Sequence, residues 1–202
     1  MNRGKYTTEI YDLLYYCEQY KSGKKVLDCG AGGAYPKLAL FADKSYELFG
    51  IDSSIESLQK AYNFAKENQI EINLKKADIR EIPFPDASFD VVYSYNTIFH
   101  LRKRGIKKAI DEIIRVLKPK GIGYINFLDV KDVIHKTDKE DAPGEFINPS
   151  NGYDAIHTLL TTNECEAMLN KVKILERQRK YINNISSNYK ETFGYLDYYF
   201  QK

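Results

Sequence analysis

Short apolar runs alternate along the chain with stretches in which apolar residues recur every three or four positions. The runs predict five buried strands, at residues 25–29, 47–52, 72–76, 89–95 and 122–128. Strands that alternate with helices are typical of βαβ units around a parallel sheet. The pattern therefore predicts an α/β fold with a doubly wound sheet, formed by a single domain over residues 1–202.

The predicted helices are marked by apolar stripes and by capping residues. The first covers residues 6–20, and a long stripe of isoleucines predicts another over 106–117. Ser53 and Glu56 predict a capping box, and thus the start of a helix whose buried stripe includes Tyr62.

The apolar pattern breaks down between residues 129 and 161. This stretch is polar and contains several prolines and glycines, so we expect a long loop that acts as a lid over a functional site. Thr161 and Glu164 then predict a capped helix. Two final strands, at 172–181 and 194–200, predict an antiparallel hairpin at the edge of the sheet.

Composition narrows the class of protein. Hydrophobic residues make up 43% of the chain and charged residues 29%, which excludes a disordered or collagen-like chain. The net charge of +2 gives no support for binding nucleic acid or anionic lipid over a whole surface. The three cysteines are far apart and no apolar run approaches the roughly 18 residues of a membrane span, so we expect a cytoplasmic protein with reduced thiols. The histidines show no metal-ligand spacing, and no metal is expected.

The segment VLDCGAGGA, at residues 26–34, carries the most chemical information. A strand that turns through glycines into a helix builds a crevice at the carboxyl end of a parallel sheet, and a ligand can approach the bare backbone there. Asp28 would repel the pyrophosphate that such a turn binds in dinucleotide-binding proteins. The same carboxylate suits a ligand that bears an ammonium group and no phosphate, such as S-adenosylmethionine.

A second acidic residue, Asp52, lies 20 residues after Gly32 at the end of the second predicted strand. An acidic side chain there can accept hydrogen bonds from both ribose hydroxyls of a nucleoside. This fits NAD and S-adenosylmethionine equally well, and the helix dipole alone also favours a carboxylate at this place. Asp28 and the glycines upstream favour the ligand-binding interpretation.

Five segments in this order resemble the class I S-adenosylmethionine-dependent methyltransferases: VLDCGAGGA, FGIDSS, ADI, PFPDASFDVVYSYNTIFHL and RVLKPKG. They cover about residues 26–128. The resemblance implies a seven-stranded Rossmann-like sheet whose last strand is antiparallel, with S-adenosylmethionine as cofactor. The cofactor-binding residues it implies are Asp28, Gly30 and Gly32 beside the methionine, Asp52 and Ser53 at the ribose, Asp78 and Ile79 at the adenine, and Ser94 facing the methionine.

The resemblance also implies in-line displacement of the sulfonium methyl by the acceptor, which depends mainly on positioning. Tyr95 would face the methyl group. His100 is a candidate base if the acceptor must lose a proton, although packing or helix capping is the commoner role of such a histidine. The candidate acceptor-binding residues are Tyr153 and His157 in the expected lid, and Tyr11 and Tyr15 in residues 1–22, which would form a helical cap.

A small-molecule acceptor is expected, because the chain shows no added recognition domain and no proline pair after the fourth predicted strand. The basic run from Arg102 to Lys108 is interpreted as an exposed helix face, which makes nucleic acid an improbable partner. Three alternatives stay open: an NAD(P)-dependent Rossmann oxidoreductase, a non-catalytic S-adenosylmethionine-binding protein and an RNA methyltransferase. The acceptor atom and the oligomeric state are also open.

Overall fold

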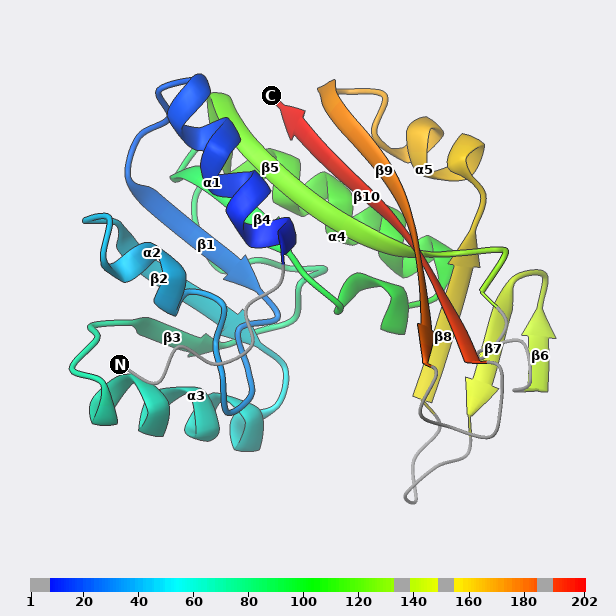
Figure 1. The fold of residues 1–202 in the computed structure, drawn as a ribbon, viewed down its shortest axis with the longest axis horizontal. Coiled ribbons are helices and arrows are strands. Elements are labelled where there is room, and N and C mark those ends of the chain that lie inside the picture. The colour runs from blue at the N-terminus through cyan, green and yellow to red at the C-terminus, as the bar shows by residue number, and fades with distance from the viewer. Residues whose placement is uncertain (1–7, 133–138, 149–154, 185–190) are drawn as a thin grey trace.

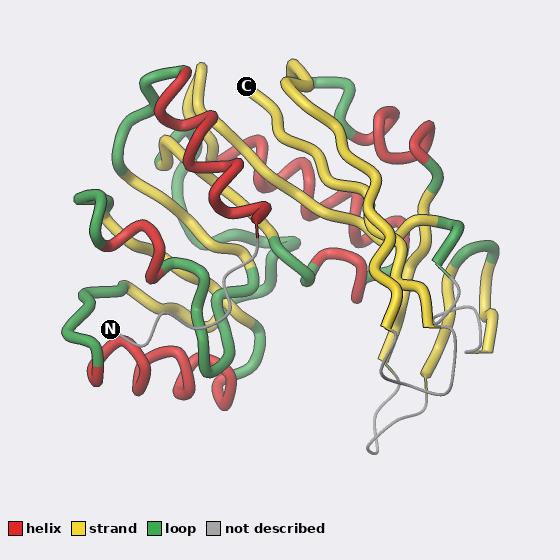
Figure 2. Tube along the Cα trace, in the orientation of Figure 1, coloured by secondary structure: helices red, strands yellow, loops and turns green. Residues whose placement is uncertain are grey.

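The computed structural model describes residues 8–132, 139–148, 155–184 and 191–202, and these form a mixed sheet with helices on both faces (Figures 1 and 2). The strands are β1 (Lys25–Cys29), β2 (Glu47–Asp52), β3 (Asn73–Lys76), β4 (Phe89–Ser94), β5 (Leu117–Asp129), β6 (Lys139–Ala142), β7 (Glu145–Asn148), β8 (Ala155–Leu160), β9 (Lys173–Asn184) and β10 (Glu191–Gln201). The helices are α1 (Thr8–Gln19), α2 (Ala39–Ala42), α3 (Ile55–Glu67), the 3₁₀ turn η1 (Ile98–His100), α4 (Lys103–Val116) and α5 (Thr162–Met168).

Seven of these strands form the predicted sheet, in the order β3-β2-β1-β4-β5-β10-β9. Neighbours from β3 to β5 are parallel, and β10 runs antiparallel to both β5 and β9. The α/β fold with a doubly wound seven-stranded sheet and an antiparallel last strand is therefore confirmed. The hairpin is also confirmed, with β9 at its outer edge.

The central strands β1 and β4 are buried on both faces of the sheet. Val26 and Val91 join the core beneath α1 and α2, whereas Leu27 and Val92 join the core beneath α4 and α5. Strands that lie between two helical layers carry apolar residues at successive positions, which explains why these runs are visible in the sequence. Among the described helices, none has the length and apolar character needed to span a membrane.

The start of α3 differs from the prediction by one residue. Ser54, not Ser53, is the N-cap, and its side chain accepts a hydrogen bond from the backbone N–H of Ser57 at 3.1 Å. The backbone N–H of Ser54 is held by Asp52 Oδ1 at 2.8 Å, which leaves Ser53 in the loop that leaves β2. Tyr62 is 54% exposed, so its place in a buried stripe was also wrong.

The segment from 129 to 161 is not a plain loop. It contains β6, β7 and β8, and β8 pairs in parallel with the end of β5 through Leu128–Leu159 and Asp129–Leu160. These strands extend the sheet on that side, where β6 is a polar edge strand. A polar edge strand lacks the apolar run that reveals a buried strand, so the sequence did not show it. The capping box at Thr161 and Glu164 is confirmed at the start of α5.

Candidate cofactor and active site

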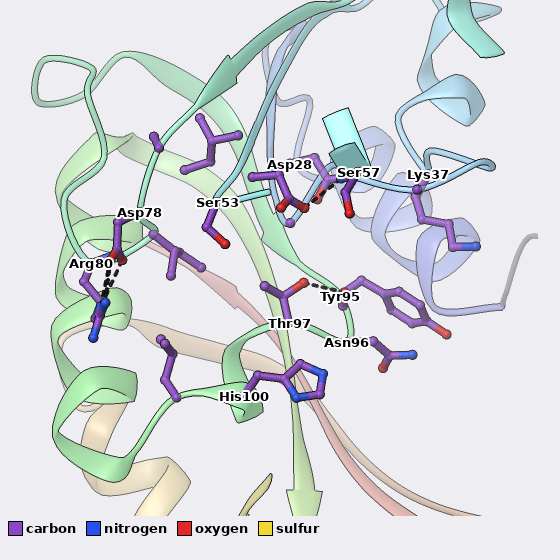
Figure 3. Close-up of a pocket in the computed structure, with 18 of the residues that line it drawn as sticks. Asp28, Lys37, Ser53, Ser57, Asp78, Arg80, Tyr95, Asn96, Thr97 and His100 are labelled. Atoms are coloured by element: carbon purple, nitrogen blue, oxygen red, sulfur yellow. Dashed lines mark hydrogen bonds and ion pairs between the residues drawn. The ribbon is translucent and has the colours of Figure 1, made fainter. Parts of the chain in front are cut away.

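The carboxyl ends of β1, β2 and β4 meet at a cavity of about 680 Å³ (Figure 3). Ligands of open α/β sheets bind in the crevice at this edge. Seven of the eight predicted cofactor-binding residues line the cavity: Asp28, Gly30, Gly32, Asp52, Ser53, Asp78 and Ile79.

The glycine turn after β1 forms the floor of the cavity and is fixed by backbone hydrogen bonds. The N–H groups of Gly30 and Ala31 both donate to the carbonyl oxygen of Ile51, at 2.8 and 2.9 Å, and tie the turn to β2. Gly30 has φ +119°, and a Cβ there would lie 2.0 Å from Thr97 Oγ1. The turn therefore needs glycine at this position for both its conformation and its space.

Asp52 holds the turn from the other side. Its Oδ2 accepts the N–H of Gly32 at 3.0 Å, and its Oδ1 accepts the N–H of Ser54 at 2.8 Å. Each carboxylate oxygen has a second lone pair, so the side chain can still accept hydrogen bonds from a ligand in the cavity.

Asp28 is only 2% exposed, at the end of β1. Burial raises its pKa to about 7, and the negative charge of Asp52 adds to this effect, while a hydrogen bond from Tyr93 Oη at 2.8 Å and the charge of Lys37 oppose it. The sequence analysis assumes that Asp28 is an ionised carboxylate. In the structure it is a buried carboxyl that titrates near neutral pH, and a cation beside it would stabilise the charged form.

Asp78 lies at the opposite end of the cavity and is paired with Arg80 (Figure 3). Its Oδ1 accepts the backbone N–H of Arg80 at 2.8 Å, and the guanidinium lies 2.5 Å from Oδ2. These interactions lower the pKa of Asp78. The sequence analysis did not predict Arg80 as a partner. Its guanidinium engages the Asp78 carboxylate that was expected to face the adenine, whereas Ile79 offers an apolar surface there.

Ser94 is the predicted cofactor residue that lies outside the cavity. Its side chain is fully buried, because the residue sits within β4 opposite Ile125 of β5 and points into the protein. The residues that follow β4 line the cavity instead, namely Tyr95, Asn96 and Thr97. Asn126 fixes this segment, since its Oδ1 accepts the Asn96 N–H at 2.7 Å and its Nδ2 donates to Asn96 Oδ1 at 2.6 Å.

His100 also lines the cavity. Its Nδ1 lies 3.2 Å from the carbonyl oxygen of Ile156, which can only accept a hydrogen bond. Nδ1 therefore carries the proton, and in the neutral ring Nε2 is left as the acceptor that a general base requires. The ring of His157 lies 5.2 Å away, centroid to centroid, so the two predicted histidines are neighbours although His157 is not part of the cavity lining.

The two tyrosines of α1 that were predicted to bind the acceptor do not line the cavity. Tyr11 and Tyr15 are 52% and 55% exposed and lie on the outward face of α1. This helix turns Ile10, Leu13 and Leu14 toward the sheet, so residues 11 and 15 must face away. Tyr153 lies outside the described residues.

Lys37 is the main residue that the sequence analysis missed. It follows the glycine turn and lines the cavity on the side of Tyr95, with Nζ 5.7 Å from the centre of that ring. Burial lowers its pKa, while the charges of Asp28 and Glu9 oppose the shift. Its only signal in the sequence was a basic residue just after a glycine-rich turn.

A family model described as a methyltransferase domain matches residues 26–121, which contain Asp28, Asp52 and Asp78. The chain is also 31% identical over 144 residues to the uncharacterized methyltransferase YcgJ of Bacillus subtilis, covering 71% of this chain and 53% of that protein. This chain carries a methyltransferase domain, and its fold is that of S-adenosylmethionine-dependent methyltransferases.

Other methyltransferases show the same likeness. The chain is 30% identical over 117 residues to the 27-O-demethylrifamycin SV methyltransferase of Amycolatopsis mediterranei, covering 57% of this chain and 42% of that one. The crystal structure of a SAM-dependent methyltransferase from Methanosarcina mazei superposes with a TM-score of 0.75 at 22% identity, covering 93% of this chain and 96% of that chain. The chain thus spans about half the length of the curated relatives it matches.

Proposed function

We propose that the chain binds S-adenosylmethionine in the cavity between Asp28 and Asp78 and transfers its methyl group to a small-molecule acceptor. The observation that supports this best is the joint placement of a glycine turn, Asp28 and Asp52 around one cavity of about 680 Å³. That volume lies in the range of small-molecule and cofactor sites.

The residues present fit this cofactor. Gly30 and Gly32 line the cavity without a Cβ, so a ligand can approach the backbone there. Asp52 and Ser53 would hold the ribose, Ile79 would pack against the adenine, and the carboxylate of Asp28 would face the ammonium group of the methionine. The carboxylate of Asp28 would repel a pyrophosphate in the same place, which argues against a nicotinamide cofactor.

The bound cofactor supplies a methyl group on a positively charged sulfur. The protein's task is then to orient the acceptor, exclude water and, where the acceptor carries a proton, remove it. Tyr95 and His100 line the cavity in the segment after β4, and the imidazole of His100 is the group that would take that proton.

A small acceptor is supported over RNA because three of the five cations in the basic run from Arg102 to Lys108 pair with carboxylates. Arg102 pairs with Asp141 and Glu145 at 2.6 and 2.7 Å, and Lys103 pairs with Glu164 at 2.7 Å. Lys107 pairs with Asp111 at 2.5 Å. Cations that are already neutralised by carboxylates attract phosphates weakly. The name of the rifamycin relative likewise states a small-molecule acceptor.

Isothermal titration with S-adenosylhomocysteine and with NADH tests the proposed cofactor. We expect the first to bind and NADH not to bind. Asp52→Asn, which keeps the shape but removes the charge, should weaken S-adenosylhomocysteine binding at least tenfold, because a hydrogen bond to a charged group contributes about 1.5–3 kcal/mol. Asp43→Asn, at an exposed aspartate after α2, is the matched control and should change nothing.

Incubation with tritiated S-adenosylmethionine and a fractionated metabolite extract tests the transfer step. Label that moves to a small metabolite supports the enzyme. Binding of the cofactor without transfer to any fraction would favour a non-catalytic binding protein, and binding of NADH alone would favour an oxidoreductase.

A further inference from the structure

A second cavity adjoins the cofactor cavity on the side of Asp78 and His100. It has a volume of about 610 Å³ and shares four lining residues with the first cavity, namely Asp78, Arg80, His100 and Leu101. Three of these, Asp78, Arg80 and His100, can be followed in Figure 3. The two cavities therefore share a wall, and a molecule in the second cavity would lie next to a bound cofactor.

One wall of the second cavity comes from the start of α4 and is basic. Arg102, Arg104 and Lys108 line it. Arg102 is already paired with two carboxylates, at 2.6 and 2.7 Å. Arg104 and Lys108 lie one helical turn apart on the same face of α4, and neither forms an ion pair with any residue that the structure describes. These two cations are therefore left to meet a ligand.

The carboxylates of the lining do not balance this charge. The lining contains four lysine or arginine side chains and two carboxylates, those of Asp78 and Glu81. Asp78 is engaged by Arg80 in a two-pronged ion pair. Its pKa is lowered chiefly by Arg80, and the positive charge of Lys108 adds to this effect across the cavity. The cavity thus has a positive potential that favours an anion.

Gly105 keeps space open between α4 and the opposite wall. It lies in the first turn of α4, and a Cβ there would come within 3.3 Å of Leu101 Cβ and 3.5 Å of Arg80 Cδ. Glycine lowers the stability of a helix, so its presence here is explained by the space that it leaves. The N-terminus of a helix also favours an anion, although Glu145 already accepts the N–H of Lys103 at 2.8 Å. The helix end therefore assists the two side chains and does not replace them.

We propose that the second cavity binds the anionic group of the methyl acceptor, a phosphate or a carboxylate, through Arg104 and Lys108. The assignment rests on the proposed function, because the acceptor must also reach the methyl group in the first cavity. It narrows the acceptor to a small, negatively charged molecule. Two cations one helical turn apart can donate to the same anion, whereas a neutral acceptor would leave both unused. An RNA strand would need a basic track longer than this one cavity.

Titration of inorganic phosphate and of acetate against the full chain tests the anion site. It is carried out without cofactor and at constant ionic strength. Arg104→Gln and Lys108→Met should each weaken binding of the preferred anion about 10-fold or more, since each removes a charge-assisted hydrogen bond. Glu81→Gln removes a negative charge from the same lining and should strengthen binding. Arg177→Gln and Lys60→Met make the same changes at paired residues outside both cavities and should change nothing.

Anion-exchange separation of tritium-labelled products tests the acceptor class. Label from S-adenosylmethionine should move to a metabolite that the resin retains. The double variant Arg104→Gln/Lys108→Met should need at least about tenfold more of that metabolite for half-maximal transfer, and its affinity for S-adenosylhomocysteine should stay within about twofold of wild type. Thermal melting of each variant separates a binding effect from a folding effect.

Each other outcome overturns a defined part of the proposal. Equal anion binding by wild type and double variant, or a labelled product that the resin does not retain, would overturn the anion site, while binding of S-adenosylhomocysteine still supports the proposed function. Binding of oligouridylate that falls steeply with salt and is lost in the double variant would assign the cavity to RNA instead. Failure of the wild-type chain to bind S-adenosylhomocysteine would overturn the proposed function, and with it the role of this cavity in holding an acceptor.

Discussion

Replacing Asp28 with asparagine should stabilise the unliganded fold at pH 8 while weakening cofactor binding at the same pH. The carboxyl is 2% exposed, and its pKa is raised to about 7 mainly by burial. Asparagine has nearly the same shape, and its Oδ1 can still accept the hydrogen bond that Tyr93 Oη donates to Asp28 at 2.8 Å. The substitution therefore removes a buried charge without opening a cavity.

The size of the effect follows from proton linkage. The pKa in the folded chain lies above the unfolded value of about 3.9, so the folded chain binds this proton more tightly. The contribution of this carboxyl to stability is full below about pH 4 and is lost as the pH rises to about 7. At pH 8 the loss of folding free energy is on the order of 4 kcal/mol, which is the upper limit of what Asp28→Asn can recover. At pH 5 this loss is smaller by about 2–3 kcal/mol.

Urea unfolding at pH 5 and pH 8 measures this difference. We expect Asp28→Asn to raise the unfolding free energy by about 1–4 kcal/mol at pH 8 and by clearly less at pH 5. Titration of S-adenosylhomocysteine at pH 8 should show at least a tenfold loss of affinity, because the ammonium group loses its carboxylate. Asp43→Asn should leave both quantities unchanged. Equal stability of variant and wild type at pH 8, or lower stability of the variant at both pH values, would refute the reasoning.

Three further substitutions test neighbouring features. Gly30→Ala places a Cβ 2.0 Å from Thr97 Oγ1 at φ +119°, so urea unfolding should show an unfolding free energy lower by about 1–3 kcal/mol. Titration should show cofactor affinity reduced more than tenfold, and an unchanged affinity would contradict the close approach of the cofactor to this turn. Tyr93→Phe removes the donor that lowers the pKa of Asp28, so the pH midpoint of S-adenosylhomocysteine binding should move upward, and a downward shift would contradict the account. Thr161→Ala removes the N-cap of α5 and should cost about 1 kcal/mol in urea unfolding, with no effect on cofactor affinity.

The sequence predicts the sheet well because its central strands are buried on both faces. β1, β2 and β4 appear at or within one residue of their predicted positions, and the glycine turn marks the crevice that they form. The strands β6 to β8 were missed, since β6 is a polar edge strand whose pairing depends on distant parts of the chain.

The sequence predicts those site residues whose place follows from the backbone. It does not predict those whose place depends on side-chain contacts. Gly30 and Asp52 follow from the turn and the strand end. Ser94 points into the protein because strand alternation turns only its neighbour Tyr95 to the cavity. The pairing of Arg80 with Asp78, two residues apart, is a local contact that the sequence analysis overlooked. The placement of Lys37 at the cavity arises from folded packing, which no local pattern reveals.

A crystal structure with S-adenosylhomocysteine present tests the central claim most directly. We expect the nucleoside in the cavity, with its ribose hydroxyls on Asp52, its adenine beside Ile79 and its amino acid beside Asp28. An empty glycine turn at saturating ligand, or a diphosphate of NADH lying across that turn in a parallel experiment, would contradict it.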